Sequence, residues 1–354
     1  MITNKINLFS LWLISLMVCV IIIILIGGYT RISDSGLSIT EWKPITGVLF
    51  PLSESSWSLE FGKYKLIDEF KLVNSLMTLD EFKFIYFWEW FHRFFARFIG
   101  IVFIIPLIYL AYNKLITKAD IPYIVSIGLL GMMQAVIGWY MVKSGLVDRV
   151  DVSQYRLSFH LITAFLILGI TFRFFIKKTI SNKKVIIAKK EKNEAKFFLI
   201  LLVLTFFQIF YGAYVSGTHS GLLYNTWPTY NQNMIPLNIF GKESLIANLF
   251  ENGDFIIFFH RTFALALTLV LLAINYRVFT KIFLHRYRTI ILILNILFLI
   301  QMLLGIFMTY LNIPWHLALL HQGNSIFIFM ILVYLQSYMN FARAKPIKDL
   351  LVNK

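Results

Sequence analysis

Four histidines stand at or near the start of strongly apolar segments of this sequence: His92, His160, His260 and His321. They form two pairs, each on two non-adjacent segments. An imidazole in or near lipid is costly unless it is paired or functional. One such histidine is as often a buried hydrogen-bonding residue as a ligand. Two pairs in the same order along the chain favour metal binding.

The pairs restrict the metal that they could bind. Zinc, copper, non-haem iron and haem differ in the further ligands that they need. A zinc site needs a third or fourth His, Cys or carboxylate, and the only cysteine, Cys19, lies in another part of the chain. Two imidazoles from facing helices are enough for bis-histidine haem iron. The aromatic residues and the 11 Met could pack a macrocycle, although they are also typical of a membrane core.

One position next to these histidines differs in chemistry between the two pairs. Glu89 precedes His92 by three residues and shares its helical face, whereas the equivalent position before His260 is Ile257. Glu89 is either an exposed interfacial charge or a carboxylate that faces a ligand as acid, base or electrostatic partner. We expect chemistry in the first half and a resident cofactor in the second.

An arginine follows a histidine in each half, as Arg93 and Arg261. Either guanidinium could bind a haem propionate, or it could anchor the helix at the membrane interface. The other three histidines fit no pair. His219 aligns with Asp34, His285 lies in a basic loop, and His316 is five residues before His321 and off its face.

The elements that must position these residues are membrane-spanning helices. The 354 residues are 58% hydrophobic and 14% charged, with a mean hydropathy of +0.74. Uninterrupted apolar runs indicate helices, since barrel strands would give short alternating segments. We predict an all-α membrane protein whose first run is a retained anchor rather than a signal peptide. The eight predicted spans are 10–28, 85–112, 121–142, 157–176, 197–216, 255–277, 289–310 and 316–339.

The net charge of +15 does not indicate nucleic-acid binding, because the basic residues follow the pattern of cytoplasmic loops. Residues 173–196 contain nine Lys or Arg, whereas the 29–84 loop has six basic and eight acidic residues. The 217–254 loop has Lys242 as its one basic residue. The bias predicts cytoplasmic N and C termini, long loops on the outer side, and all four paired histidines near the outer face.

An internal repeat organises the chain into two four-helix bundles. The matching pairs are Gly27 and Gly212, Trp42 and Trp227, His92 and His260, Gly138 and Gly305, and His160 and His321. Their offset falls from 185 to 168 across the first outer loop and from 167 to 161 across the second, and it is nearly constant elsewhere. We predict an amino-terminal half at 1–176, a basic cytoplasmic linker at 177–196 and a carboxy-terminal half at 197–354, with ligand sites between facing helices.

Taken together, these passages resemble the haem A synthase family over nearly the whole chain. The motifs that carry the resemblance are Gly28-Tyr29-Thr30-Arg31, Ser35-Gly36-Leu37-Ser38, Glu41-Trp42-Lys43-Pro44, Glu89-Trp90-Phe91-His92-Arg93, Gln134-Ala135-Val136-Ile137-Gly138-Trp139, Tyr155-Arg156-Leu157-Ser158-Phe159-His160, Asn225-Thr226-Trp227-Pro228, Phe259-His260-Arg261 and Leu319-Leu320-His321-Gln322.

The resemblance implies an eight-helix oxidoreductase that converts the C8 methyl of haem O to a formyl group by successive hydroxylations. By analogy, His260 and His321 hold a haem b cofactor, with Arg261 beside it. His92 and His160 hold the iron of the substrate haem O, with Glu89 near the reacting side. The product, haem A, is made for cytochrome c oxidase.

The resemblance also implies a bacterial inner membrane, with both haem sites near the periplasmic face. It implies haem O synthase, the protohaem farnesyltransferase, and oxidase assembly factors as partners, and it allows a homo-oligomer. The sequence departs from some relatives in lacking a cysteine pair in the first outer loop, as in the α-proteobacterial and mitochondrial branch. Ala96 replaces a frequent Gly. A bis-histidine cytochrome b for quinol electron transfer and a haem carrier or exporter are the alternatives.

Overall fold

The computed structural model describes residues 8–43, 45–146, 150–183 and 185–345, so Pro44 and both chain ends lie outside the described residues. Eight helices in these ranges are long and apolar enough to cross a membrane. The prediction of an all-α, multi-span membrane protein is confirmed. The long helices are α1 (Leu8–Ile32), α4 (Leu79–Tyr112), α5 (Ile121–Gly145), α6 (Gln154–Lys183), α7 (Lys189–Gly217), α9 (Gly253–Thr280), α10 (Arg288–Tyr310) and α11 (Trp315–Phe341).

Shorter elements occupy the connections between these helices. They are η1 (Thr46–Val48), α2 (Glu54–Tyr64), α3 (Asp68–Leu72), η2 (Ser220–Leu222), α8 (Leu245–Glu251) and η3 (Ile282–Tyr287). Two short strands, β1 (Ile186–Ala188) and β2 (Arg343–Lys345), pair in parallel. The predicted linker 177–196 is therefore largely regular structure, because α6 continues into it, β1 lies within it and α7 begins at Lys189.

The chain divides into two compact units, residues 1–167 and 168–354, and the division falls within α6. In the first unit, α1 packs along α4, where the indole nitrogen of Trp12 donates to the carbonyl oxygen of Val102 at 3.1 Å. At 34 residues, α4 is about 50 Å long, longer than the roughly 30 Å hydrocarbon core. The helix is therefore longer than a crossing of that core requires.

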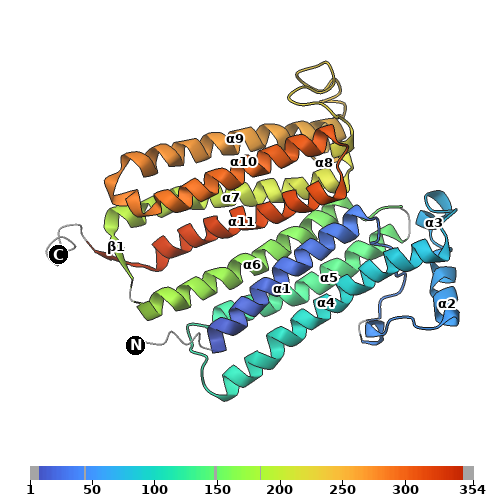
Figure 1. Ribbon diagram of the computed structural model, residues 1–354, viewed down its shortest axis with the longest axis horizontal. Helices are drawn as coiled ribbons and strands as arrows, with labels where there is room; N and C mark the ends of the chain where they lie inside the picture. Colours follow the sequence, from blue (N-terminus) through green and yellow to red (C-terminus); the bar gives the residue numbers. More distant parts are fainter. Residues whose placement is uncertain (1–7, 44, 147–149, 184, 346–354) are drawn as a thin grey trace. The chain divides into compact units, whose positions relative to one another are not determined.

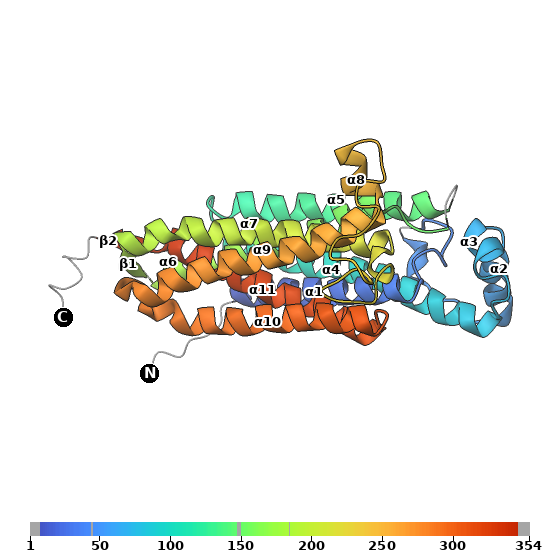
Figure 2. The ribbon, with the colours of Figure 1, turned by 90° about the horizontal axis from the view of Figure 1, so that it is seen from above.

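The small helices α2 and α3 lie beside the first turns of α4, as both views show (Figures 1 and 2). A capping box starts α4, with the Glu81 carboxylate accepting from the backbone nitrogen of Thr78 at 2.7 Å. Trp57, Phe61 and Tyr64 of α2 pack onto α4 in one aromatic cluster. The segment between α1 and α4 is thus packed against α4 rather than being an open connection.

In the second unit, α7, α9, α10 and α11 run side by side (Figure 1). Their core includes the fully buried Leu201, Leu294 and Leu332. The side-chain amides of Asn275 on α9 and Asn295 on α10 bond reciprocally at 2.8 and 2.9 Å, so neither polar group is left unpaired in the bundle.

Glu69 in α3 is a buried carboxyl group outside the membrane-spanning helices. Glu69 is 5% exposed, and its Oε2 atom has no hydrogen-bond partner within the described ranges. Burial chiefly, and then the negative charges of Glu89, Asp34 and Asp151, raise the pKa of Glu69 to about 8. The packed loop therefore favours protonated Glu69 at neutral pH.

We expect the packing of α3 to weaken as the pH rises from about 4.5 to about 8. A carboxyl group released to solvent loses its proton near the ordinary pKa of 4.5, whereas packed Glu69 keeps its proton up to about 8. Below pH 4.5 Glu69 is protonated in both the packed and the released state, so pH no longer affects the packing. Above pH 8 the free-energy loss of the packed state relative to low pH is constant, at no more than roughly 5 kcal/mol.

Limited proteolysis of residues 50–78 tests this expectation. Cleavage should be faster at pH 8 than at pH 5 in the wild type, and Glu69→Gln should remove the difference because it has no ionisable group. Asp68→Asn, at the partly exposed neighbouring position, is the control that should keep the difference. A Glu69→Gln variant with the wild-type pH dependence would show that another group titrates.

Candidate functional site

The first unit brings together the two histidines predicted for it. His92 comes from α4 and His160 from α6, and their ring centroids lie 6.4 Å apart with planes inclined by 53°. Both residues are half-buried. The Nδ1 atoms of both rings are buried and have no hydrogen-bond partner among the described residues. The two imidazoles are therefore polar groups whose buried Nδ1 atoms are not satisfied by the described protein.

Each of these imidazoles lies against a glycine of a neighbouring helix. A Cβ atom added to Gly27 of α1 would lie 3.0 Å from Cε1 of His92. A Cβ added to Gly138 of α5 would lie 3.0 Å from Cε1 of His160. Glycine thus lets the neighbouring backbone approach the ring edge, which fixes the position of the imidazole.

The spacing of His92 and His160 fits one iron between two imidazoles. Metal–nitrogen bonds of about 2.0 Å on opposite sides of an iron put the ring centres roughly 6 Å apart. In the described part of the chain, no group of three or more His, Cys, Asp or Glu could hold a metal ion. A bare zinc or non-haem iron would lack ligands there, whereas a haem brings four nitrogens of its own.

The second unit repeats the arrangement with His260 of α9 and His321 of α11. A Cβ on Gly212 of α7 would lie 3.3 Å from Cε1 of His260, and a Cβ on Gly305 of α10 would lie 3.4 Å from Cε1 of His321. Both histidines are half-buried. The Nδ1 atom of His321 is buried without a partner in the described ranges. This donor set also suits a haem, by the same chemistry.

A glutamine on the preceding helix supports one histidine in each unit. The side-chain amide of Gln134 donates to the carbonyl oxygen of His160 at 2.9 Å. The amide of Gln208 donates to the carbonyl oxygen of His260 at 2.9 Å and lies 3.2 Å from its Nδ1. Such second contacts fix the orientation of a ligand ring.

Glu89 is buried and fully engaged, at 3% exposure. Its Oε2 accepts from the hydroxyl of Ser38 and the backbone nitrogen of Ile39, both at 2.7 Å. Its Oε1 accepts from the guanidinium of Arg93 at 2.6 Å. The reading of Glu89 as an exposed interfacial charge is therefore wrong, since the carboxylate lies inside the protein, one helical turn before His92.

Arg93 holds the loop between α1 and α4 to its own helix. Besides Glu89, its guanidinium donates to the carbonyl oxygens of Ile39 at 3.1 Å and Glu41 at 3.2 Å. Arg97, one turn further along α4, donates to the carbonyl oxygen of Lys43 at 2.9 Å. The helix that carries His92 thus binds the loop through a row of guanidinium groups.

Arg261 likewise binds a loop to its own helix in the second unit. Its guanidinium donates to the carbonyl oxygens of Thr226 at 3.0 Å and Tyr224 at 3.3 Å, and its carbon lies 4.8 Å from the ring centroid of Tyr230. A further bond joins Arg261 to the hydroxyl of Thr309 at the end of α10. Contact of Arg261 with a propionate stays a prediction.

Sequence reasoning missed this loop-anchoring role of the two arginines. One sequence signal pointed to this role. In both halves an arginine directly follows a histidine, and a loop rich in motifs precedes the same helix. The carbonyl partners lie 35 to 54 residues away in sequence, where no local periodicity applies.

Comparison with known proteins identifies the family of this chain. The profile of the COX15-CtaA family, described as cytochrome oxidase assembly protein, matches residues 10–333. A heme A synthase of Rhizobium rhizogenes is 38% identical over 322 residues, covering 90% of this chain and 86% of that protein.

Two further relatives carry the same name. One from Wolbachia pipientis subsp. Culex pipiens is 40% identical over 90% of this chain and 94% of its own length. One from Parvibaculum lavamentivorans is 43% identical over 73% and 74%. With most of its length matched, this chain belongs to the COX15-CtaA family of cytochrome oxidase assembly proteins, the haem A synthase family.

Proposed function

We propose that this chain is a haem A synthase that oxidises the C8 methyl group of haem O to a formyl group by successive hydroxylations. The observation that carries the proposal is the pair of half-buried imidazoles, 6.4 Å apart, with a buried carboxylate one helical turn from one of them. The names of the relatives support the same activity.

His92 and His160 bind the iron of the substrate haem O from two sides. Because both rings lie against glycines, the substrate iron is held at a fixed depth between α4 and α6. Glu89 and Arg93 hold the loop at Ile39 to α4, one helical turn from His92. A fixed substrate orientation directs oxidation to one methyl group out of several.

Glu89 supplies the negative charge at the substrate site. Conversion of a methyl to a formyl group replaces two hydrogens with one oxygen, so protons must leave the reacting carbon or its hydroxyl. A carboxylate is a suitable acceptor. Its bonds to Ser38, Ile39 and Arg93 keep the carboxylate in one orientation.

His260 and His321 would hold a haem b in the carboxy-terminal half, with Arg261 directly after His260 in the chain. When bound, this haem supplies one-electron redox chemistry. The equivalent of Glu89 here is the buried Ile257, which offers packing and no proton acceptor. The two halves therefore divide the work between substrate oxidation and electron transfer.

The rival functions are a quinol-linked cytochrome b and a haem carrier. Haem extraction and mass spectrometry separate them, after expression beside a haem O synthase. A synthase yields a haem with a formyl group, whereas a cytochrome b or a carrier returns only the haems that the host already makes. Formyl haem at the level of cells without the chain would contradict the proposal.

Gly138→Ala should lower haem A yield about tenfold and leave haem b unchanged. Its new methyl group would lie 3.0 Å from His160, so the substrate ligand must shift. Gly305→Ala is the matched control, because its methyl group would make an ordinary 3.4 Å contact with His321. Pyridine haemochrome spectra and extracted haem measure both. Equal loss of haem A in the two variants would show that glycine spacing does not position the substrate.

We also propose an inner-membrane topology with cytoplasmic termini and with haem O synthase and oxidase assembly factors as partners. A reporter fusion after Lys190 should be active only in the cytoplasm, because residues 173–196 concentrate positive charge. A fusion after Lys242, in the second long outer loop, should give the opposite result. Activity of the Lys190 fusion outside the cytoplasm would invert the proposed topology.

A further inference from the structure

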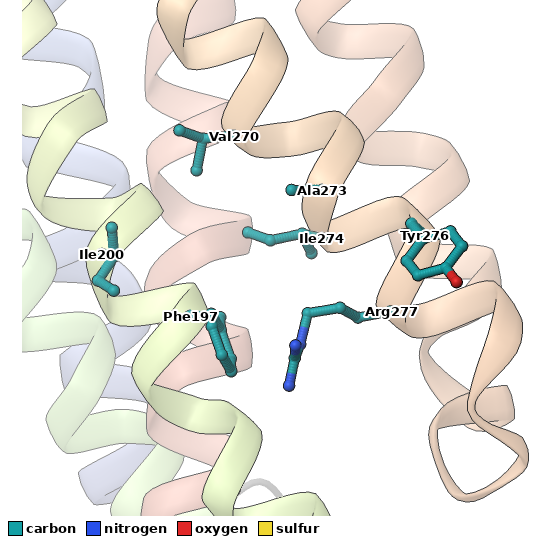
Figure 3. Close-up of a pocket in the computed structure, with 7 residues that line it drawn as sticks. All are labelled: Phe197, Ile200, Val270, Ala273, Ile274, Tyr276 and Arg277. Carbon is teal, nitrogen blue, oxygen red and sulfur yellow. The ribbon is translucent and has the colours of Figure 1, made fainter.

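A half-open cavity of about 370 Å³ lies between α7 and α9 of the second unit. Figure 3 shows the seven residues that line it. Phe197 and Ile200 come from α7, and Val270, Ala273, Ile274, Tyr276 and Arg277 come from α9. The lining is apolar except at Arg277 and the Tyr276 hydroxyl. We call this cavity the α7–α9 groove, and its volume lies within the usual range of ligand sites.

The groove runs from the lysine-rich helix ends toward the middle of the membrane. Phe197 follows the basic first turns of α7, and Arg277 lies in the last turn of α9. Val270 is seven residues before Arg277, about 10 Å along the helix. Arg277 and Phe197 lie next to each other at one end, and Val270 and Ile200 lie further along (Figure 3). One end of the groove is thus cationic and the other apolar.

The cationic end has more positive than negative charge. The carboxylate of Glu194 accepts from Nε and Nη2 of Arg277 at 2.9 and 3.1 Å, and from Nζ of Lys281 at 2.6 Å. One carboxylate therefore serves two cations. The third guanidinium nitrogen of Arg277, Nη1, has no hydrogen-bond partner among the described residues.

Lys196 adds a further charge at the same place. Its ammonium lies 5.3 Å from the ring centroid of Phe197, and the guanidinium carbon of Arg277 lies 3.8 Å from the same centroid. In the described ranges no carboxylate pairs with exposed Lys196. Tyr276 at the rim is 73% exposed, as is typical of an aromatic residue at the membrane interface.

We propose that the α7–α9 groove binds one anionic phospholipid, with an acyl chain along Ile200, Ala273 and Val270 and the phosphate at Arg277 and Lys196. The helices cross a membrane, so lipid is the solvent of this surface, and the excess positive charge favours a headgroup with net negative charge. A zwitterionic headgroup would bind less strongly, because its own ammonium group would lie among these cations and be repelled by them.

The test compares dioleoyl phosphatidylglycerol with dioleoyl phosphatidylcholine on the full chain in an uncharged detergent. Native mass spectrometry counts the lipid retained. The wild type should retain at least about five times as much phosphatidylglycerol as phosphatidylcholine, which is the effect expected of one uncompensated cation. Lys196→Gln should lower this ratio. Ala273→Phe should fill the groove and bring retention of both lipids to the same low level.

Arg288→Gln on α10 is the matched control, since it removes a cation whose guanidinium donates to the carbonyl oxygen of Phe279 and does not line the groove. It should keep the wild-type ratio, and far-ultraviolet circular dichroism checks that each variant is folded. Equal retention of both lipids by the wild type, or an unchanged ratio in Ala273→Phe, would overturn the proposal. Displacement of phosphatidylglycerol by millimolar inorganic phosphate would likewise show a free-anion site.

Discussion

Replacing either carboxy-terminal histidine, as His260→Ala or His321→Ala, should reduce the haem b retained by the purified chain at least about tenfold. The remaining imidazole would leave iron with one open position and a weakened hold. Gly212 and Gly305, which lie against the two rings, cannot replace the lost ligand because they carry no side chain. Reduced-minus-oxidised spectra after purification measure the effect.

His316→Ala is the control for this prediction. His316 is an exposed histidine at the start of α11, five residues before His321, and it should be dispensable. A low-spin bis-histidine spectrum that persists at full intensity in both His260→Ala and His321→Ala would refute the assignment of the cofactor site. Loss of haem b in His316→Ala as well as in His321→Ala would indicate that α11 is generally sensitive to substitution.

Glu89→Gln should lower haem A yield by about 100-fold or more while haem b binding stays intact. The substitution keeps the shape of the side chain but removes the proton acceptor and the ion pair with Arg93. The chain should then accumulate haem O or a hydroxylated intermediate. Extracted haems separated by liquid chromatography and identified by mass measure the distribution.

Two controls separate the charge of Glu89 from its hold on the loop. Ser38→Ala removes one of the loop bonds and keeps the carboxylate, so it should lower the yield only a few-fold. Asp80→Asn changes an exposed carboxylate on the same helix and should have no effect. A wild-type yield in Glu89→Gln would leave the substrate site without an identified acid or base. Equal losses in Glu89→Gln and Ser38→Ala would reduce Glu89 to a loop anchor.

The spans were predictable because apolar length alone determines them. The predicted run 121–142 is α5 at Ile121–Gly145, and 289–310 is α10 at Arg288–Tyr310. Helices that extend beyond their apolar run were predicted too short. The prediction for α4 began at residue 85, and the helix begins at Leu79, because a capping box of Thr78 and Glu81 starts the helix before its apolar run.

The histidine pairs were predictable since a repeated spacing exposes them, and the structure brings His92 and His160 together. The partners of the charged groups were not. The contacts of Arg93 with Ile39 and of Arg277 with Glu194 join residues 54 and 83 positions apart, and they depend on how helices pack. Neither hydropathy nor charge patterning contains that information. The internal repeat itself stays a prediction.

The most direct test of the whole account is haem analysis of membranes that contain a haem O synthase together with the wild-type chain, the His92→Ala variant or no added chain. We predict formyl haem in membranes with the wild-type chain, and haem O without formyl haem in membranes with His92→Ala or with no added chain. Haem b should still purify with His92→Ala, because its ligands are in the other unit. Formyl haem in membranes without the chain, or undiminished formyl haem with His92→Ala, would contradict it.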